Sequence, residues 1–289
     1  MADYLTNGGQ SVNSVSLCAP IEGLSCFGCC PPIRPVHYDH LEHVRSLRRE
    51  FRENRARYLD EGPRYRPIVG FSCWALGYLD GRGRAIGCLL HPCQNRGEDL
   101  RHLIDYGNKC RREQCRPARE FSLLPPDGQR FWLPLVTGMN AFYFSSPRAN
   151  PLFHLMLWGP AVLERMRALS EANGWSVTEL LWRDVFLTDT AWTPSAHRYL
   201  FRLLLETGSH TGEAMGTLPE RGRRLLEGFL GSPEVRKRRC ETDHEALPLV
   251  HALAIDPDFQ DLLRLGLGWK RCAPETAARV HRDLLALVL

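Results

Sequence analysis

The segment Cys26-Phe27-Gly28-Cys29-Cys30-Pro31-Pro32 carries three thiols within five residues. Core packing rarely calls for that density of cysteine. A C-x2-C spacing lets one short turn direct two sulfurs to a single ion, at about 2.3 Å from each. Cys26 and Cys29 are therefore predicted metal ligands. Cys30 points elsewhere in an extended or turning chain, so it could complete a cluster, bridge to a second ion or act as a reactive thiol.

The cysteines are concentrated in the first part of the chain, where nine of the eleven precede residue 116. The sequence starts with neither the basic residues nor the apolar run of a secretory signal. No apolar segment approaches the roughly 18 residues that a membrane span needs. We therefore expect a cytoplasmic protein with no membrane partner. In that reducing compartment, clustered thiols indicate metal binding or redox chemistry rather than disulfides.

Later cysteines are candidates to complete the site. Cys110 and Cys115, flanked by arginines, form the natural second half, and Cys88 is the expected third contributor. The predicted metal ligands are thus Cys26, Cys29, Cys30, Cys88, Cys110 and Cys115. Four thiolates serve both zinc and iron-sulfur clusters. The nearly all-sulfur donor set and the fused Cys29-Cys30 pair favour an iron-sulfur cluster, with Zn2+ as the alternative.

Other cysteines and the histidines are predicted to serve the fold. Cys73 lies in an apolar run beside Trp74, which suits a core residue and a ligand equally. Cys18 and Cys93 are expected to be ordinary buried cysteines, since cysteine is a common small hydrophobe. Structural roles are also expected for Cys240, Cys272, His37, His40, His43 and His91.

The spacing of these motifs resembles that of the bacterial cysteine-cluster (CxxCC) proteins described as zinc- or iron-chelating. The matching pieces are Cys26-Phe27-Gly28-Cys29-Cys30, Cys73-Trp74-Ala75-Leu76, Gly87-Cys88-Leu89-Leu90-His91-Pro92, and Cys110-Arg111 with Cys115-Arg116-Pro117. The resemblance covers residues 18 to 120. It implies a zinc ion or an iron-sulfur cluster held by these cysteines, and it implies no established reaction. It says nothing of the helical half that follows.

Composition and length favour a two-domain globular protein. The chain of 289 residues is 44% hydrophobic and 24% charged, as in soluble globular proteins. We predict a mainly α fold with a small β-hairpin, in which a cysteine-rich metal-binding N-terminal module precedes a helical C-terminal domain. The predicted parts are a flexible arm over 1–17, the metal-binding module over 18–120, a connection rich in proline and aromatic residues over 121–150, and the helical domain over 151–289.

Periodicity and punctuation residues predict the individual elements. A helix is expected over 36–61, with Leu47 and Phe51 on its apolar side. A small hairpin is expected over 68–90, turning at Asp80-Gly81-Arg82-Gly83. A short helix is expected to open at 97–101 and run towards Cys110. Further helices are signalled by an apolar stripe over 152–169, a capping box at Ser176 and Glu179, and prolines at 194, 233 and 274, with Gly208 ending the helix that starts at 194.

Three hypotheses for function remain open at this stage. The first is a metal-binding protein, and the second is a redox or group-transfer enzyme that uses the cluster or a reactive thiol such as Cys30. The third is an adaptor for RNA, DNA or a protein, with arginines at 45–57 and 236–239 as its contact surface. The net charge of +4 is modest for a dedicated nucleic-acid binder. The arginines of the first helix are interleaved with glutamates, which favours a solvated face over a binding face.

Overall fold

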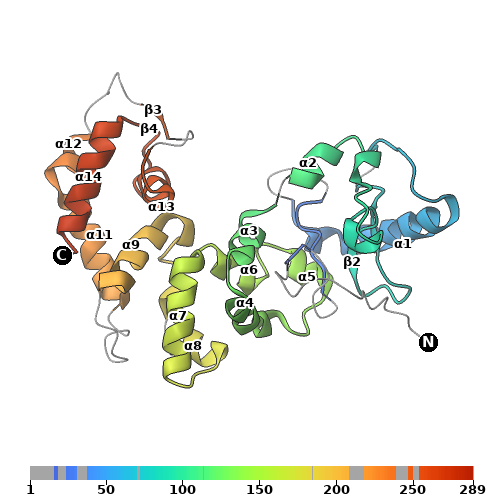
Figure 1. The fold of residues 1–289 in the computed structure, drawn as a ribbon, viewed down its shortest axis with the longest axis horizontal. Coiled ribbons are helices and arrows are strands. Elements are labelled where there is room, and N and C mark those ends of the chain that lie inside the picture. Colours follow the sequence, from blue (N-terminus) through green and yellow to red (C-terminus); the bar gives the residue numbers. More distant parts are fainter. Residues whose placement is uncertain are drawn as a thin grey trace. The chain divides into compact units, whose positions relative to one another are not determined.

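The chain is described here by a computed structural model, drawn in Figure 1. It describes residues 16–18, 24–30, 38–69, 72–112, 114–183, 185–207, 218–238, 247–249 and 254–288. The chain divides into two compact units, Met1–Met156 and Leu157–Leu289. The described parts are mainly helical with two small antiparallel sheets, which confirms the predicted mainly α class with a small hairpin. Of the predicted arm over 1–17, only Ser16 and Leu17 are described, and Leu17 is fully buried.

The main helix of the N-terminal unit is α1 (Val44–Glu61). A 3-10 turn, η1 (His40–His43), precedes it, and the Asp39 carboxylate caps this turn by accepting from the amide of Leu41 at 2.8 Å. The helix therefore starts later than the predicted residue 36, which lies outside the described residues. Its buried side chains are Leu47 and Phe51, as expected from the periodicity.

The predicted hairpin is confirmed. Strands β1 (Leu76–Tyr78) and β2 (Ile86–Cys88) pair antiparallel, with Leu76 opposite Cys88. The Asp80 carboxylate accepts from the amides of Arg82 and Arg84 at 3.1 and 3.0 Å, which closes the connecting turn. Helix α1 lies directly on this hairpin because Gly77 has no side chain: a Cβ there would lie 3.2 Å from a carbonyl oxygen of α1.

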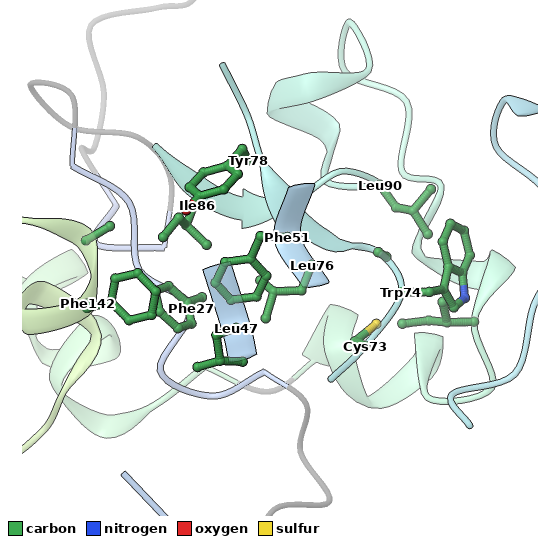
Figure 2. Packing of buried hydrophobic residues seen from close by; sticks show 13 residues of the cluster. Phe27, Leu47, Phe51, Cys73, Trp74, Leu76, Tyr78, Ile86, Leu90 and Phe142 are labelled. Atoms are coloured by element: carbon green, nitrogen blue, oxygen red, sulfur yellow. The ribbon is translucent and has the colours of Figure 1, made fainter. Parts of the chain in front are cut away.

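A cluster of apolar side chains joins α1, the hairpin and the cysteine-rich segment (Figure 2). Phe27, from the centre of that segment, is fully buried. Its ring makes edge contacts with Phe51 and Phe142, each at 5.4 Å between centroids. Such aromatic pairs add stabilisation beyond the area they bury. The segment is therefore fixed to the core through Phe27, between its flanking cysteines.

Short helices and turns complete the N-terminal unit. They are η2 (Pro92–Gln94), η3 (Arg101–Leu103), α2 (Gly107–Arg112), α3 (Arg116–Ser122), α4 (Pro126–Trp132), η4 (Leu133–Val136), α5 (Ala141–Ser145) and α6 (Pro151–Met156). The prediction of one helix running from 97 towards Cys110 is wrong. Ile104 is extended and forms an isolated bridge with Arg66, so helical hydrogen bonding stops between η3 and α2.

The C-terminal unit is built from longer amphipathic helices. Its elements are α7 (Pro160–Ala172), α8 (Val177–Arg183), η5 (Val185–Leu187), α9 (Pro194–Thr207), α11 (Leu218–Gly231), α12 (Pro233–Arg238), β3 (Leu247–Pro248), α13 (Pro257–Asp261), the π-helical turn η6 (Leu262–Gly266), β4 (Arg271–Cys272) and α14 (Pro274–Ala286). The three predicted proline starts are confirmed. The predicted end at Gly208 lies outside the described residues.

The sequence predicted the capping box of this unit correctly, but it did not predict the pairing of β3 with β4. The capping box is present, because the Ser176 amide donates to the Glu179 carboxylate at 2.7 Å and the Glu179 amide donates to Ser176 Oγ at 3.2 Å. The apolar stripe over 152–169 is divided between α6 and α7, since Gly159 has a φ of 81° and ends the run. Pairing of β3 with β4 joins residues too far apart in sequence to be read from local patterns.

Candidate metal centre

Eight cysteines line one cavity of about 550 Å3 in the N-terminal unit, which we call the sulfur cavity. They are Cys18, Cys26, Cys29, Cys30, Cys73, Cys88, Cys110 and Cys115. All six predicted ligands are among them. The structure adds Cys18, which was expected to be an ordinary buried residue, and Cys73, which the sequence left undecided. None of the ten described cysteines forms a disulfide.

Four hydrogen bonds hold Ser25 and the Cys26–Cys30 segment that follows it in place. The Ile86 amide of β2 donates to Ser25 Oγ at 2.9 Å, and the Ser25 hydroxyl donates back to the Ile86 carbonyl. The Phe27 amide donates to the buried Ser145 Oγ of α5 at 2.9 Å. His40 Nε2 lies 3.3 Å from the Gly28 carbonyl and must be its donor, because a carbonyl only accepts. His40 thus positions the segment, in the structural role predicted for it.

Residue 28 must be glycine because the backbone of α5 passes very close to it. A Cβ built there would lie 2.6 Å from the Ser145 carbonyl oxygen, and real contacts of that kind are essentially never so short. The same Cβ would lie 3.5 Å from the Cys26 sulfur. Glycine therefore lets the C-x2-C turn sit against α5 while its thiols line the sulfur cavity.

The other cysteines are positioned by separate elements. Asn54 of α1 donates its amide to the carbonyls of Cys73 and Leu76, at 3.2 and 2.8 Å, and so fixes the turn before β1. Cys88 is the last residue of β2. Cys110 is in α2, and its carbonyl accepts from the Arg101 guanidinium at 3.0 Å. Cys115 immediately precedes α3.

Burial dominates the acidity of these thiols. It raises the pKa of Cys18 and of Cys88 to about 11 and that of Cys73 to about 12. The pKa of Cys30 is raised well above its ordinary value, first by a hydrogen bond with Cys29 and then by burial. Nucleophilic thiols require the opposite shift, a depressed pKa. Without a bound cation, these cysteines are neutral thiols near pH 7.

Backbone amides counteract the increase in thiol pKa at four of the cysteine sulfurs. The Gly28 amide donates to Cys26 Sγ at 3.3 Å. Comparable amide donors are Ala75 and Leu76 to Cys73, Leu90 to Cys88, and Ala118 to Cys115. Each donor lowers the pKa of its sulfur, because hydrogen bonds to the charged form favour that form. Amides that converge on sulfur atoms are also among the factors that tune iron-sulfur clusters.

Basic side chains share the wall of the sulfur cavity. They are Arg101, Lys109 and Arg111. Arg101 is fixed by Asp99, whose two carboxylate oxygens accept from Nε and an Nη at 2.9 and 2.8 Å. This guanidinium holds the pKa of Asp99 at about 2. Its charge also lowers the pKa of Cys18 and Cys88, against the larger effect of burial. The cavity therefore contains positive charge that can balance thiolates.

Residues outside the thiol set have the following positions. Cys93 is exposed, so its predicted burial is wrong; it follows Pro92 at the start of an exposed 3-10 turn. His91 lines the cavity, and its Nδ1 accepts from the Cys93 amide at 3.2 Å, as suits a turn residue. Cys272 is fully buried in the C-terminal unit. Cys240 and His37 lie outside the described residues.

A second cavity of about 730 Å3, the arginine groove, lies between α1 and the turn of the hairpin. Its arginines are Arg48, Arg52, Arg55, Arg82 and Arg84, and Asp80 is the acidic residue among its lining side chains. Arg55 donates to the Tyr78 carbonyl at 3.0 Å, and Arg48 lies 5.6 Å from the centre of the Phe142 ring. The sequence favoured a solvated face for the arginines of α1. Three of them, Arg48, Arg52 and Arg55, also line this concave surface. The other predicted cluster, 236–239, includes Arg239, which lies outside the described residues.

Within the described ranges, no three histidine, cysteine or acidic side chains lie in an arrangement that would itself hold a metal ion. In the same ranges, no helix combines the length and apolar character needed to cross a bilayer. No family model, curated protein or solved structure matches the chain. The resemblance to cysteine-cluster proteins therefore stays a prediction based on the residues alone.

Proposed function

We propose that the protein binds an inorganic centre, an iron-sulfur cluster or zinc, through the cysteines of its N-terminal unit. The observation that supports this most strongly is the meeting of Cys26, Cys29, Cys30, Cys88, Cys110 and Cys115 at one cavity. These residues come from four separate stretches of the chain. Buried thiols used only as small hydrophobes have no reason to gather around a shared cavity.

The surroundings of the thiols fit a bound cation. A metal displaces thiol protons, so its binding offsets the raised pKa values that burial causes. Amide donors at Cys26, Cys73, Cys88 and Cys115 are in place to stabilise the resulting thiolates. Arg101 adds positive charge at the same wall. Thiolate ligation would also cross-link segments that are otherwise joined by short helices and turns.

An iron-sulfur cluster fits better than a single zinc ion. The cavity volume of about 550 Å3 far exceeds the space of one ion, and its potential donors are mainly sulfur. A cluster would supply one-electron transfer, whereas zinc bound by four cysteines is usually structural. The chain's own residues bind the centre, exclude bulk water from the buried sulfurs and balance the charge.

Anaerobic purification with metal and sulfide analysis tests this proposal. We expect iron with equimolar acid-labile sulfide, and a brown absorption that dithionite bleaches. Zinc without sulfide would assign the alternative centre. The double variant Cys26→Ser and Cys29→Ser should lose metal, and the matched control Cys93→Ser should retain it because Cys93 is outside the cavity. Wild-type protein free of iron and zinc would refute the proposal.

A second candidate function is binding of nucleic-acid phosphates in the arginine groove. Arginine suits phosphate because its planar fork donates two parallel hydrogen bonds. Five arginines and one aspartate line the groove, so its local charge is positive although the whole chain is only mildly basic. Phe142 and Tyr78 line its apolar side but are buried, so binding there would depend on the arginines.

Salt-dependent binding to a single-stranded oligonucleotide tests this second function. The pair Arg52→Glu and Arg82→Glu should abolish binding at low salt. The pair Arg45→Glu and Arg57→Glu makes the same charge change on exposed residues outside the groove, and it should retain most of the affinity. Each lost phosphate contact reduces the salt slope by roughly 0.7 to 0.9. Equal losses in both pairs would show a non-specific charge effect.

A further inference from the structure

One wall of the arginine groove is a single face of helix α1. The residues of α1 that line the groove recur at helical spacing; they are Arg48, Arg52, Arg55, Ala56 and Leu59. The sequence of α1 interleaves arginine with glutamate. Among the described residues, however, no acidic side chain of α1 lines the groove. The fold therefore sorts the two charges of this helix onto different faces.

The glutamates in the middle of α1 contact other groups. Glu53 Oε1 lies 3.8 Å from Arg49 Nε, in an ion pair at i,i+4 spacing. Glu50 accepts a hydrogen bond from the Ser72 hydroxyl. The groove face, in contrast, carries arginines at i and i+4, and like charges at that spacing destabilise a helix. Such a face lowers the stability of the protein, as functional sites often do.

The second wall of the groove is the turn of the hairpin. Arg82 and Arg84 of this turn are exposed and line the groove. The Asp80 carboxylate accepts from the amides of both residues and from that of Ala85 at 3.4 Å. It also lies 3.6 Å from Arg84 Nε. The acidic group of the groove is therefore committed to the turn and to Arg84.

The two walls are fixed to each other by the fold. Arg55 of α1 donates to the Tyr78 carbonyl of β1 at 3.0 Å. Arg52 Nε donates to the Arg48 carbonyl at 3.0 Å, which orients its guanidinium. Gly83 has a φ of 67°, and a Cβ there would lie 3.5 Å from the Tyr78 ring, so the turn lies against that ring. A cationic site that is already ordered loses less entropy when an anion binds.

Size and charge restrict the occupant of the groove. Its volume of about 730 Å3 is that of a small-molecule site, for which roughly 300 to 1,000 Å3 is usual. A phosphomonoester carries about 1.5 to 2 negative charges near neutral pH and has three strong acceptor oxygens. Each guanidinium can donate two parallel hydrogen bonds to such oxygens. A terminal phosphate can therefore engage two arginines at once, whereas the internal phosphates of a strand carry one charge each.

We infer that the arginine groove recognises a terminal phosphate group, either on a small organic phosphate or at the phosphorylated end of a nucleic-acid strand. This inference rests on the second proposed function and specifies the chemical class of its ligand. Arg48 and Arg52 bind the phosphate from the α1 wall, and Arg82 binds it from the turn. Leu59, which is 65% exposed, and Met139 line the same groove and contact the organic part of the ligand.

Two matched pairs of ligands test the inference by calorimetry. The first pair is adenosine 5′-monophosphate and adenosine, and the second is one single-stranded oligonucleotide with a 5′-phosphate or a 5′-hydroxyl. We expect the phosphorylated member of a pair to bind about tenfold more tightly, since one charge-assisted hydrogen bond has that magnitude. Preference in the first pair indicates a small organic phosphate, and preference in the second pair alone indicates a strand end.

Two other outcomes separate this inference from the function on which it rests. Equal affinity of the two strands, without binding of the nucleotide, would overturn the inference and leave nucleic-acid binding standing. Absence of binding by all four ligands would overturn both.

The pH dependence identifies the charge of the bound group. A terminal phosphate takes up its second proton near pH 6, whereas arginine stays charged. Burial raises the pKa of Tyr78, and hydrogen bonds from the Arg84 and Ala85 amides lower that of Asp80 against the effect of its burial. Neither side chain therefore titrates between about pH 7.5 and about pH 5.5. Binding should weaken as the pH falls through this range, and constant affinity would overturn the inference.

Paired substitutions on α1 then locate the phosphate. Arg48→Gln with Arg52→Gln should abolish the preference for the phosphorylated ligand. Arg45→Gln with Arg57→Gln removes the same charge from exposed residues outside the groove and should retain the preference. Because like charges repel on the groove face, the first pair should leave the thermal midpoint unchanged or higher, whereas a structural role would lower it. Retained preference in the first pair, or loss in both pairs, would overturn the assignment.

Discussion

The two units of the chain bury their side chains in different ways. In the C-terminal unit, Phe201 of α9 is fully buried against Trp158, Phe186 and Trp192, with ring centroids 4.4 to 5.1 Å apart. In the N-terminal unit, α1 is the one long helix among the described elements, and the other helices have seven residues or fewer. Helices that short are marginal without tertiary support.

This comparison separates two sources of stability. Close packing of large aromatic and aliphatic side chains stabilises the C-terminal unit. The N-terminal unit places a cavity lined by eight cysteines where further packing would otherwise be. If the proposed centre occupies that cavity, its bonds to sulfur replace the missing packing. The units should then respond differently to metal removal, mutation and pH.

Metal removal should have the largest effect and should act on the N-terminal unit alone. Structural thiolate sites contribute on the order of 10 kcal/mol to folding. A strong chelator should abolish amide hydrogen-exchange protection in β1, β2 and α2, and leave α9 and α11 protected. Mass-spectrometric hydrogen exchange measures this difference. Equal loss of protection in both units would contradict the comparison.

Phe201→Ala should produce the next largest effect, in the C-terminal unit. Deleting a fully buried aromatic ring typically costs about 3 to 5 kcal/mol, because it removes contacts and leaves a cavity. Chemical denaturation should show this loss while the metal content stays unchanged. The control Trp182→Ala removes an 81% exposed ring and should change stability by less than about 0.5 kcal/mol. A large loss of metal in Phe201→Ala would show that the units depend on each other.

Gly28→Ala should disturb the sulfur cavity at intermediate cost. Its Cβ would meet the Ser145 carbonyl oxygen at 2.6 Å, so the segment must shift, at about 1 to 3 kcal/mol. We expect reduced metal content together with lower stability of the N-terminal unit. Gly81→Ala is the matched control, since a Cβ at that position meets nothing within 4 Å. Unchanged metal content in Gly28→Ala would show that the segment tolerates the shift.

His281→Gln should give the smallest effect, visible through pH. Burial lowers the pKa of His281, and its Nε2 shares a hydrogen bond with the hydroxyl of Tyr199. A base whose folded pKa is depressed stabilises the fold above its unfolded pKa, near 6.5, and loses that contribution as the pH falls towards the folded pKa. Stability of the C-terminal unit should therefore decrease from about pH 7 to about pH 5, less steeply in the variant. An unchanged slope in the variant would exclude His281 as the responsible group.

Local features of the fold were readable from the sequence. The capping box at Ser176, the proline helix starts and the turn at Asp80 each depend on a few neighbouring residues, and the structure confirms them. The predictions from the sequence failed where pairing between residues far apart in the chain determines the local structure. Ile104 is extended because it bridges Arg66, and β3 pairs with β4 across more than twenty residues. Neither pairing leaves a periodic trace in the sequence.

The same distinction holds for the candidate site. The C-x2-C-C segment drew attention to Cys26, Cys29 and Cys30 because its spacing is local, and the structure brings the other three predicted cysteines to the same cavity. Cys73 was ambiguous because Trp74 and its neighbours look like an ordinary buried run. Cys18 lacks any nearby partner in sequence. Only the three-dimensional structure shows that Cys18 and Cys73 line the same cavity as the six predicted cysteines.

Helix α1 lines the arginine groove and also contacts one of the cysteines of the sulfur cavity through a hydrogen bond. Asn54 holds the carbonyl of Cys73 on the sulfur side, and the next residue, Arg55, both lines the arginine groove and holds the carbonyl of Tyr78. A rearrangement around Cys73 would therefore displace a guanidinium only one residue away. If both proposed functions hold, oxidation or loss of the centre at the cysteines should therefore change the affinity of the arginine groove for an anion.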